Sequence, residues 1–446
     1  MNINKTLLIA FGFLLSIEQG FTVVLGTLSN GVARGADVIM PVDLAIYALL
    51  LVKPSSTTPK RTSGIFSFAL TFAVLFLACT SFGEFVAIEK ADFRFGLVHL
   101  ARAILVFICI LTRVSSKQDM IEFSKGVIYG LGFEALIGVW QWQIGPVSLP
   151  FINVVNTWRA TGTIGVANAL GLFLATLAPL SIRMAMFTKV KPKWLWYTIS
   201  VLSMGALLAT YTRGAWVAFA ISMIIFLYID FLNKKLTTQQ ANWLLIVIVL
   251  AAVFTTVKYG NVITGRMEHS KEAIVSDKKH SRVGLAKDSI RIIRENKITG
   301  VGLNNYRYHA DIEIQGTRIV HNVYLLVAAQ QGIPGAVIFI VLNLTVFIAG
   351  FRIMKSRDPV LYHIGMGCLT GMLVIFIYYF IAPDYRLVIL KLHHWRALAM
   401  IIAVLAVDDR TRQLRLRMAQ IKRRKKANLA KSQLDGTSQI IHETTL

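Results

Sequence analysis

Residues 321–351 read HNVYLLVAAQQGIPGAVIFIVLNLTVFIAGF, a block of thirty-one residues without Asp, Glu, Lys or Arg. A helix crosses a bilayer with about 20 apolar residues, so this block is long enough to span one. Gly332-Ile333-Pro334-Gly335 interrupts it, and we expect a short outer helix, a kink and then the main span. Irregular backbone at membrane depth needs protein or a water-filled cavity around it.

Comparable apolar blocks recur along the whole chain, which has 446 residues, 55% hydrophobic and 16% charged. This composition is typical of a polytopic membrane protein, and length and apolarity predict an all-α fold with about twelve transmembrane helices. Lys5 and the apolar run after it lack a small-x-small cleavage site, which predicts an uncleaved first span. The expected spans are Leu7–Leu28, Val38–Leu51, Gly64–Ile88, Phe95–Leu111, Ile121–Trp142, Gly165–Met186, Trp194–Tyr211, Ala215–Phe231, Trp243–Val257, His321–Phe351, Val360–Ala382 and Leu387–Val407.

The formal net charge is +24, and the distribution of Lys and Arg among the loops between the spans indicates the topology. With twelve spans, five basic loops lie on one side, together with a tail whose stretch from Arg410 to Lys431 has no acidic residue. These loops carry Lys53, Lys60 and Arg61; Arg113 and Lys117; Arg183, Lys189, Lys191 and Lys193; Lys234 and Lys235; and Arg352, Lys355 and Arg357. The positive-inside rule makes this side the cytoplasm and puts both termini there. Beside a membrane domain, such a tail is expected to contact anionic lipid head groups rather than nucleic acid.

These predictions divide the chain into four regions: spans 1–9 in residues 1–258, a periplasmic segment in 259–320, spans 10–12 in 321–407, and a basic cytoplasmic tail in 408–446. The stretch from Lys258 to Arg318, which covers most of this segment, holds twelve Lys or Arg against seven Asp or Glu. Its stretch Ser281–Glu295 is predicted to be a helix with Ser281 as N-cap, and with apolar residues Val283, Leu285, Ile290 and Ile293 between basic ones. This helix either lies on the membrane surface or turns guanidinium groups such as Arg282 and Arg291 toward an anionic ligand.

Two further arginines are expected on the same outer side. Arg213 occupies the turn Thr210–Trp216 between two spans, where it either snorkels to lipid head groups or binds phosphate oxygens with its guanidinium fork. Arg159 precedes the sixth span, and Asn168 lies about one turn inside that helix, where an amide needs a partner.

His321 begins the broken block and borders the basic segment. A His at a helix start is commonly a cap or interface residue, but this setting also suits a catalytic base. Inside the spans, His99, Arg102, Glu84 and Glu134 are expected to form internal pairs, such as Arg102 with a Glu, rather than a proton relay. Asp311 and Glu313 form only a weak magnesium pattern, so we expect no metal and no other cofactor.

Taken in order, several pieces resemble the O-antigen ligase and polymerase superfamily of bacterial envelope glycosyltransferases. They are Trp158–Asn168, Thr210–Trp216, Arg282 through Tyr306, His321-Asn322-Val323-Tyr324-Leu325 and Gln331–Gly335. The resemblance covers roughly Trp158 to Gly335. Two positions depart from the family pattern, which has Ser where this chain has Thr212 and often Trp where it has Leu285.

The resemblance implies a GT-C-type glycosyltransferase of the bacterial inner membrane with a periplasmic active site. Such an O-antigen ligase transfers a glycan from undecaprenyl pyrophosphate to the lipid A core of lipopolysaccharide, with inversion and without metal. His321 would then be the catalytic base, because histidine titrates near neutral pH. Pyrophosphate would be bound by Arg213, Arg282, Arg159 and Arg291, with Asn322, Tyr324, Asn168 and Thr212 in support.

Two alternatives remain open at this point. An O-antigen polymerase performs the same chemistry with another glycan chain as acceptor. A lipid-linked glycan flippase or other transporter would more often show repeated halves with broken helices at the midplane, and this chain has no internal repeat. In every case the expected partners are membrane lipids and a lipid-linked glycan, not nucleic acid.

Overall fold

The computed structural model describes residues 3–17, 21–22, 38–39, 41–52, 64–145, 148–149, 152–153, 159–235, 282–310 and 319–444. Within these residues the chain is helical, apart from two antiparallel hairpins of two-residue strands. The predicted all-α membrane fold is confirmed, since seven helices are long and apolar enough to cross a membrane by length and composition.

The N-terminal half of the chain holds these elements in order: α1 (Ile3–Leu14), β1 (Phe21–Thr22), β2 (Val38–Ile39), α2 (Pro41–Leu51), α3 (Gly64–Ser81), η1 (Phe82–Phe85), α4 (Lys90–Arg113), α5 (Lys117–Gln143), β3 (Ser148–Leu149), β4 (Ile152–Asn153), η2 (Gly162–Ile164), α6 (Ala167–Phe187), α7 (Lys193–Ala209) and α8 (Arg213–Leu232). Strand β1 pairs with β2, and β3 with β4. The C-terminal half holds α10 (Arg282–Glu295), α11 (Tyr306–His309), α12 (Val323–Ile353), α13 (Pro359–Tyr378), η3 (Asp384–Arg386) and α14 (Val388–Thr444).

The predicted spans agree with these helices in all but three cases. The expected second span, Val38–Leu51, is wrong in its extent, because Val38–Ile39 is strand β2 and α2 begins only at Pro41. The expected first span, Leu7–Leu28, is wrong in its extent, because α1 ends at Leu14 and Phe21–Thr22 is a strand paired with β2. Apolarity predicted one continuous helix there, although Glu18-Gln19-Gly20 interrupts the run. The expected ninth span, Trp243–Val257, lies outside the described residues.

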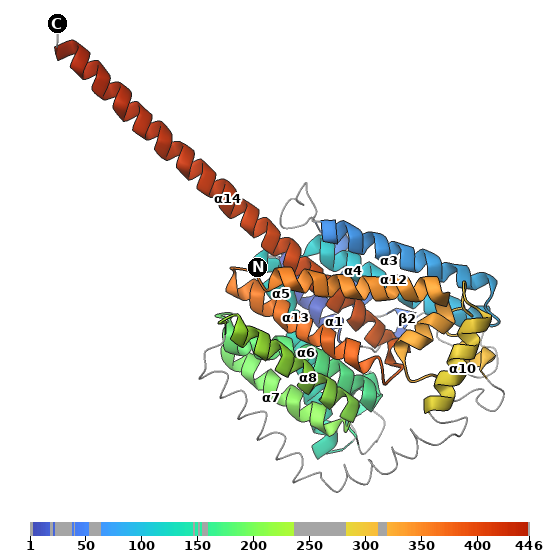
Figure 1. Cartoon of the computed structure of the whole chain (residues 1–446). Coiled ribbons are helices and arrows are strands. Elements are labelled where there is room, and N and C mark those ends of the chain that lie inside the picture. Colours follow the sequence, from blue (N-terminus) through green and yellow to red (C-terminus); the bar gives the residue numbers. More distant parts are fainter. Residues whose placement is uncertain are drawn as a thin grey trace.

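Helix α14 forms the centre of the bundle in its first half and leaves the bundle in its second. Residues from Ile389 to Val407 are almost all buried, and they pack against α4, α12 and α13. Beyond them the same helix continues as a long extension away from the other helices (Figure 1). Around this centre, α13 packs on α6 and α8, and α1 packs on α5.

Helices α1 and α5 run parallel and in very close contact. A Cβ atom on Gly126 would lie 2.1 Å from the carbonyl oxygen of Ile9, and one on Gly130 would lie 3.0 Å from that of Phe13. Small residues permit such backbone approach between membrane helices. Since Ile9 lies beside Gly126 and Phe13 beside Gly130, the start of α1 lies at the same end of the bundle as the start of α5.

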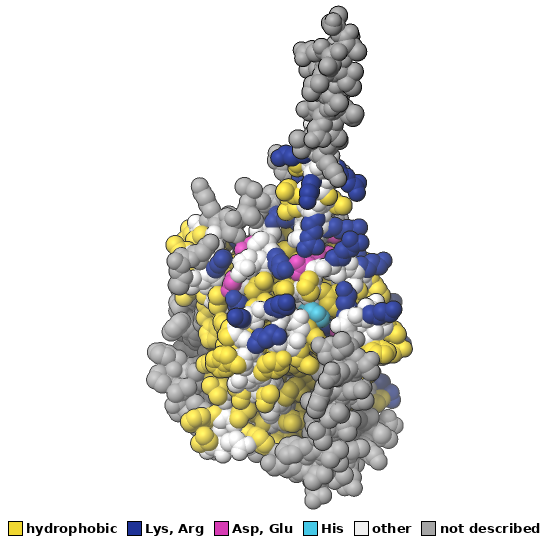
Figure 2. Space-filling model, turned by 90° about the vertical axis from the view of Figure 1, so that its left-hand side faces the viewer, with side chains coloured by type: hydrophobic (Ala, Val, Ile, Leu, Met, Phe, Trp, Pro, Cys, Tyr) yellow, Lys and Arg dark blue, Asp and Glu magenta, His cyan; other side chains and the backbone are white. Residues whose placement is uncertain are grey.

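That end of the bundle is basic. Lys117 at the start of α5 pairs with Asp358 at 2.7 Å, and Arg352 at the end of α12 pairs with Asp409 at 2.7 Å. Figure 2 shows Lys and Arg side chains gathered near the point where the α14 extension leaves the bundle, with hydrophobic side chains below them. The basic residues at this end belong to loops that the positive-inside rule assigns to the cytoplasmic side in the twelve-span prediction.

Several ionisable side chains of the helices are paired, although not all as predicted. Arg102 pairs with Asp43 of α2 at 2.8 Å, so the expected Glu partner is wrong. The two residues lie far apart in sequence, and only helix packing brings them together. Glu84 pairs with Arg94 at 2.6 Å, while Glu134 binds a loop that is described below.

Candidate functional site

Two polar side chains of α5 hold the loop that carries Arg159. The Gln141 carboxamide oxygen accepts a hydrogen bond from the backbone N–H of Gly162 at 2.9 Å. Glu134 accepts one from the backbone N–H of Thr163, also at 2.9 Å. Because buried polar groups need partners, these contacts fix the loop against α5 just before α6 begins. Arg159 is thereby presented at the end of the bundle opposite to the basic one.

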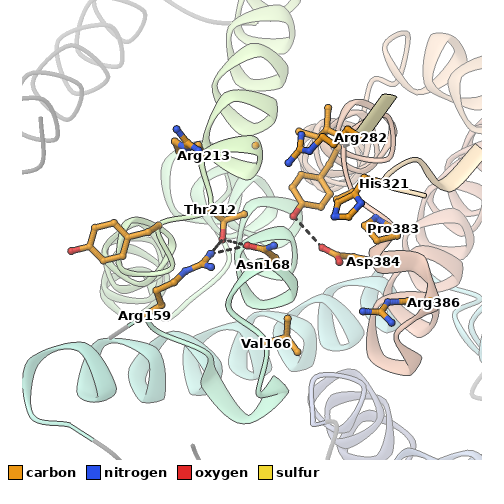
Figure 3. A pocket seen from close by; sticks show the side chains of 15 residues that line it. Arg159, Val166, Asn168, Thr212, Arg213, Arg282, His321, Pro383, Asp384 and Arg386 are labelled. Carbon is orange, nitrogen blue, oxygen red and sulfur yellow. Dashed lines mark hydrogen bonds between the residues drawn. The ribbon is translucent and has the colours of Figure 1, made fainter. Parts of the chain in front are cut away.

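Arg159 joins this loop to the turn between α7 and α8. Its Nε donates to the carbonyl oxygen of Thr210 at 2.7 Å. Its terminal nitrogen donates to Asn168 Oδ1 at 2.7 Å and to Thr212 Oγ1 at 3.1 Å, as Figure 3 shows. All three acceptors are uncharged, so these contacts orient the guanidinium without neutralising its charge.

The α7–α8 turn places Arg213 at the first position of α8. Tyr211 adopts a positive φ of 50°, which reverses the chain within three residues. Thr212 Oγ1 donates to the carbonyl oxygen of Ala167 at 3.1 Å, and this ties the turn to the first residue of α6. The first turns of α6 and α8 are therefore neighbours, and the positive ends of their dipoles point toward the same space.

Helix α10 begins with Arg282 and packs on the outer half of α12. Its buried face consists of Leu285, Asp288, Ser289 and Ile292, and the cluster around Leu285 and Ile292 includes Leu326 and Ala329 of α12. The predicted helix is confirmed, but Val283 and Ile290 of the expected apolar set are exposed. Packing against α12, which the sequence pattern does not show, selects the buried face.

The predicted break in α12 is confirmed at Gly332, which has a φ of 70° and a ψ of 178°. Pro334 lacks an N–H, so the carbonyl of Gln330 loses its helical donor. The N–H of Gly302 donates to this carbonyl at 2.9 Å, and that of Val301 donates to Ala329 at 2.9 Å. The glycine-rich loop after α10 thus replaces the hydrogen bonds that the break removes.

His321 lies immediately before the N-cap of α12 and is tied to the end of α13. The Asn322 side chain accepts from the N–H of Leu325 at 3.0 Å and donates to the carbonyl of Phe380 at 3.3 Å. His321 Nδ1 lies 3.1 Å from the carbonyl oxygen of Ile319. A carbonyl can only accept, so Nδ1 carries the proton and Nε2 has the lone pair.

The connection between α13 and α14 supplies residues that the sequence reasoning missed. Tyr378 Oη donates to the buried Asp384 carboxylate at 3.0 Å, and Arg386 lies two residues farther on. Burial raises the pKa of Asp384 above its ordinary value, while the Tyr378 hydrogen bond and Arg386 act in the opposite direction. A signal was present, since two charged residues stand in a short outer connection between apolar blocks.

These segments meet in one pocket of about 590 Å³. That volume lies within the range of about 300–1,000 Å³ typical of small-molecule sites. Figure 3 shows Arg213 and Arg282 near its upper part, with His321 and Asp384 on one side and Asn168, Thr212 and Arg159 on the other. The lining residues are Arg159, Val166, Asn168, Tyr211, Thr212, Arg213, Gly214, Arg282, His321, Tyr378, Ile381, Ala382, Pro383, Asp384 and Arg386.

The pocket is strongly cationic. Its lining contains four arginines in addition to His321, and Asp384 is the one carboxylate in the lining. Helices α6, α8 and α10 each contribute a residue of their first turn, so helix dipoles add to the positive potential. This combination is suited to an anion with several oxygen atoms, such as a phosphate group.

Residues 198–340 match the family model described as O-antigen ligase. No curated protein shows a significant match to the chain. The family match indicates a function of the O-antigen ligase and polymerase type.

The O-antigen ligase match includes Arg213, Arg282 and His321, whereas Arg159, Asn168 and Asp384 come from outside it. The pocket is therefore completed by residues before and after the matched segment. This explains why the α13–α14 connection was not found from resemblance alone.

Three predicted site residues do not line this pocket. Arg291 pairs with Asp288 at 2.7 Å and with Glu295 at 2.9 Å on its own helix. Asn322 caps α12, as described above. Tyr324 donates to the carbonyl of Phe376 at 3.1 Å and packs among aromatic rings of α12 and α13.

The described residues contain no group of three or more His, Cys, Asp or Glu with the arrangement of a metal site. Asp311 and Glu313, which form the weak magnesium pattern in the sequence, lie outside those residues, as do Ser281 and Trp158.

Proposed function

We propose that this protein is an O-antigen ligase that transfers a glycan from undecaprenyl pyrophosphate to the lipid A core of lipopolysaccharide. One observation carries the proposal: Arg159, Arg213, Arg282 and His321 come from four separate segments and line a single pocket. Cations and a base at one reaction site are what transfer from a pyrophosphate donor requires.

In this proposal the arginines bind the donor pyrophosphate. Arg213 and Arg282 stand at the first positions of α8 and α10, where the helix dipoles reinforce their charge. Arg159 is oriented by three uncharged acceptors and adds a third guanidinium. As the glycosidic bond breaks, negative charge grows on the leaving phosphate, and these groups stabilise it. Arg386 is a further candidate for this role.

His321 is the proposed catalytic base. An acceptor hydroxyl attacks the anomeric carbon of the sugar joined to pyrophosphate, and a new glycosidic bond forms. The bond between that carbon and the phosphate oxygen breaks, and its electron pair leaves with undecaprenyl pyrophosphate. His321 Nε2 takes the hydroxyl proton, because the contact of Nδ1 with Ile319 leaves the lone pair on Nε2. Attack opposite the leaving group inverts the anomeric centre.

The pocket is proposed to open on the periplasmic side of the inner membrane. The basic end of the bundle, with Lys117 and Arg352, is opposite to it along the helices, and the positive-inside rule assigns basic ends to the cytoplasm. Helix α1 begins at the basic end and α14 extends beyond it, which supports cytoplasmic termini. No metal or other cofactor is part of the proposed reaction.

Reconstitution tests this proposal. Purified protein in liposomes is mixed with a lipid-linked glycan and rough lipopolysaccharide, and both lipids are separated on gels. A glycan ladder on lipopolysaccharide is the expected result. Lengthening of the lipid-linked glycan instead would identify a polymerase, and movement across the bilayer without new bonds would identify a flippase; either result would overturn the ligase assignment.

A further inference from the structure

A second pocket lies at the basic end of the bundle, where α12 ends and α14 passes beside it. Its volume is about 650 Å³. The cations in its lining are Arg352, Lys355, Arg357, Arg412 and Arg415, and the carboxylates are Asp408 and Asp409. The pocket therefore has an excess of positive charge at one place on the surface, on the side of the bundle where Figure 2 shows Lys and Arg gathered.

Both carboxylates of this pocket are already engaged. Asp409 pairs with Arg352 at 2.7 Å, and Asp408 accepts a hydrogen bond from Ser356 at 2.6 Å. Across the described ranges, Lys355, Arg357 and Arg412 form no ion pair, and all three are exposed. Three exposed cations thus face the pocket without an ion pair to an acidic side chain, and an anion that binds there relieves their mutual repulsion.

The apolar surface beside the pocket identifies the kind of anion. Helix α12 exposes a ridge of large hydrophobic residues at intervals of three or four, namely Val337, Ile340, Leu344, Ile348 and Phe351. The ridge ends directly before Arg352, at the level where the apolar helices end. A ligand that fits both features has acyl chains along α12 and a phosphate in the pocket.

We propose that this pocket binds the head group of an anionic glycerophospholipid. Lys355, Arg357 and Arg412 hold the phosphate oxygens, with the guanidinium groups able to bind two oxygens at once. The acyl chains lie along the exposed ridge of α12. The site lies at the basic end of α12, and the main span after the break, Gly335–Ile353, puts about 28 Å of helix between it and the break at Gly332. It is therefore separate from the proposed donor site and does not depend on it.

Native mass spectrometry of the full-length protein in neutral detergent tests the proposal. Cardiolipin, phosphatidylglycerol, phosphatidylcholine and inorganic phosphate are added separately, and bound adducts are counted. The pocket variant carries Lys355→Gln, Arg357→Gln and Arg412→Gln. A matched control, Arg417→Gln with Lys422→Gln and Arg423→Gln, removes the same charge from exposed positions on the α14 extension that do not line the pocket.

The expected result is preferential binding of the anionic lipids over phosphatidylcholine. The pocket variant should lose this binding by between about tenfold and about a hundredfold at low salt, whereas the control variant should keep it. Equal losses in both variants would show only diffuse attraction to the basic extension and would overturn the proposal. Binding of inorganic phosphate without lipid preference would assign the pocket to free phosphate and would also overturn it. A melting temperature of the pocket variant equal to that of the unaltered protein reports that the variant is folded.

Discussion

Replacing Arg159 by Lys tests whether the guanidinium fork, rather than positive charge alone, organises the pocket. Arg159 bonds to Thr210 through Nε and to Asn168 and Thr212 through a terminal nitrogen. A lysine has one nitrogen, which cannot occupy both positions, so at least one charged hydrogen bond is lost. Such a bond contributes about 1.5–3 kcal/mol, and the lower end applies because the side chain is half-buried. We therefore expect kcat/KM to fall about 10- to 30-fold, from a loss of about 1.5–2 kcal/mol.

The assay is initial-rate glycan transfer in liposomes, with melting temperature as the test of folding. Arg94→Lys serves as the matched control, because Arg94 bonds to Glu84 through two nitrogens at the protein surface and does not line the pocket. The control should transfer normally. A folded Arg159→Lys protein with normal kcat/KM would refute the reasoning, since charge without the fork would then be sufficient.

A double-mutant cycle tests whether the loss in Arg159→Lys arises from the hydrogen bond between Arg159 and Asn168. Asn168→Ala removes one acceptor of the Arg159 guanidinium, so the losses from Asn168→Ala and Arg159→Lys should overlap. The double variant is expected to be less impaired than the product of the single effects. Strictly multiplicative losses would mean that the two residues act separately.

Three of the four other predictions concern the same pocket, and the fourth concerns the expected absence of a metal. His321→Ala should lower kcat by about 10²- to 10⁴-fold while donor binding persists, and wild-type rates should fall in acid; rates that rise in acid would indicate a phosphate-binding cation instead of a base. Arg213→Lys should remain impaired like Arg213→Ala, as measured by transfer and donor binding; if both variants work normally, Arg213 only contacts lipid head groups. The raised pKa of Asp384 means that the folded protein favours the protonated acid, so this group's stability contribution is full below the unfolded pKa of about 3.9 and declines as pH rises through the folded value. Asp384→Asn, which is neutral throughout, should therefore melt above wild type at neutral pH and lose this advantage in strong acid; an advantage that is constant with pH would contradict the assignment to Asp384. Transfer should persist in excess chelator and in Asp311→Ala, and activity that disappears in chelator and returns with magnesium would establish a metal requirement.

Local chemistry made part of the site predictable. Gly332 and Pro334 indicated the break in α12 because a missing N–H and a positive φ are properties of those residues themselves. Arg213 and His321 were found because polar side chains at the ends of apolar blocks are conspicuous. Asp384 and Tyr378 were missed, because a short connection between two spans does not show which cavity it borders.

By itself, the sequence determined the membrane class and the positions of most helices, and it led to a prediction of the side on which each basic loop lies. These properties can be read along the chain, because the length of an apolar block and the alternation of charged loops do not depend on which residues come into contact. Tertiary structure alone decided that Arg159 bonds to Thr210 and that Arg102 pairs with Asp43. Partner choice depends on helix packing, which brings residues far apart in the chain within hydrogen-bond distance and separates others nearby. The convergence of Arg159, Arg213, Arg282, His321 and Asp384 on one pocket is therefore a property of the folded bundle.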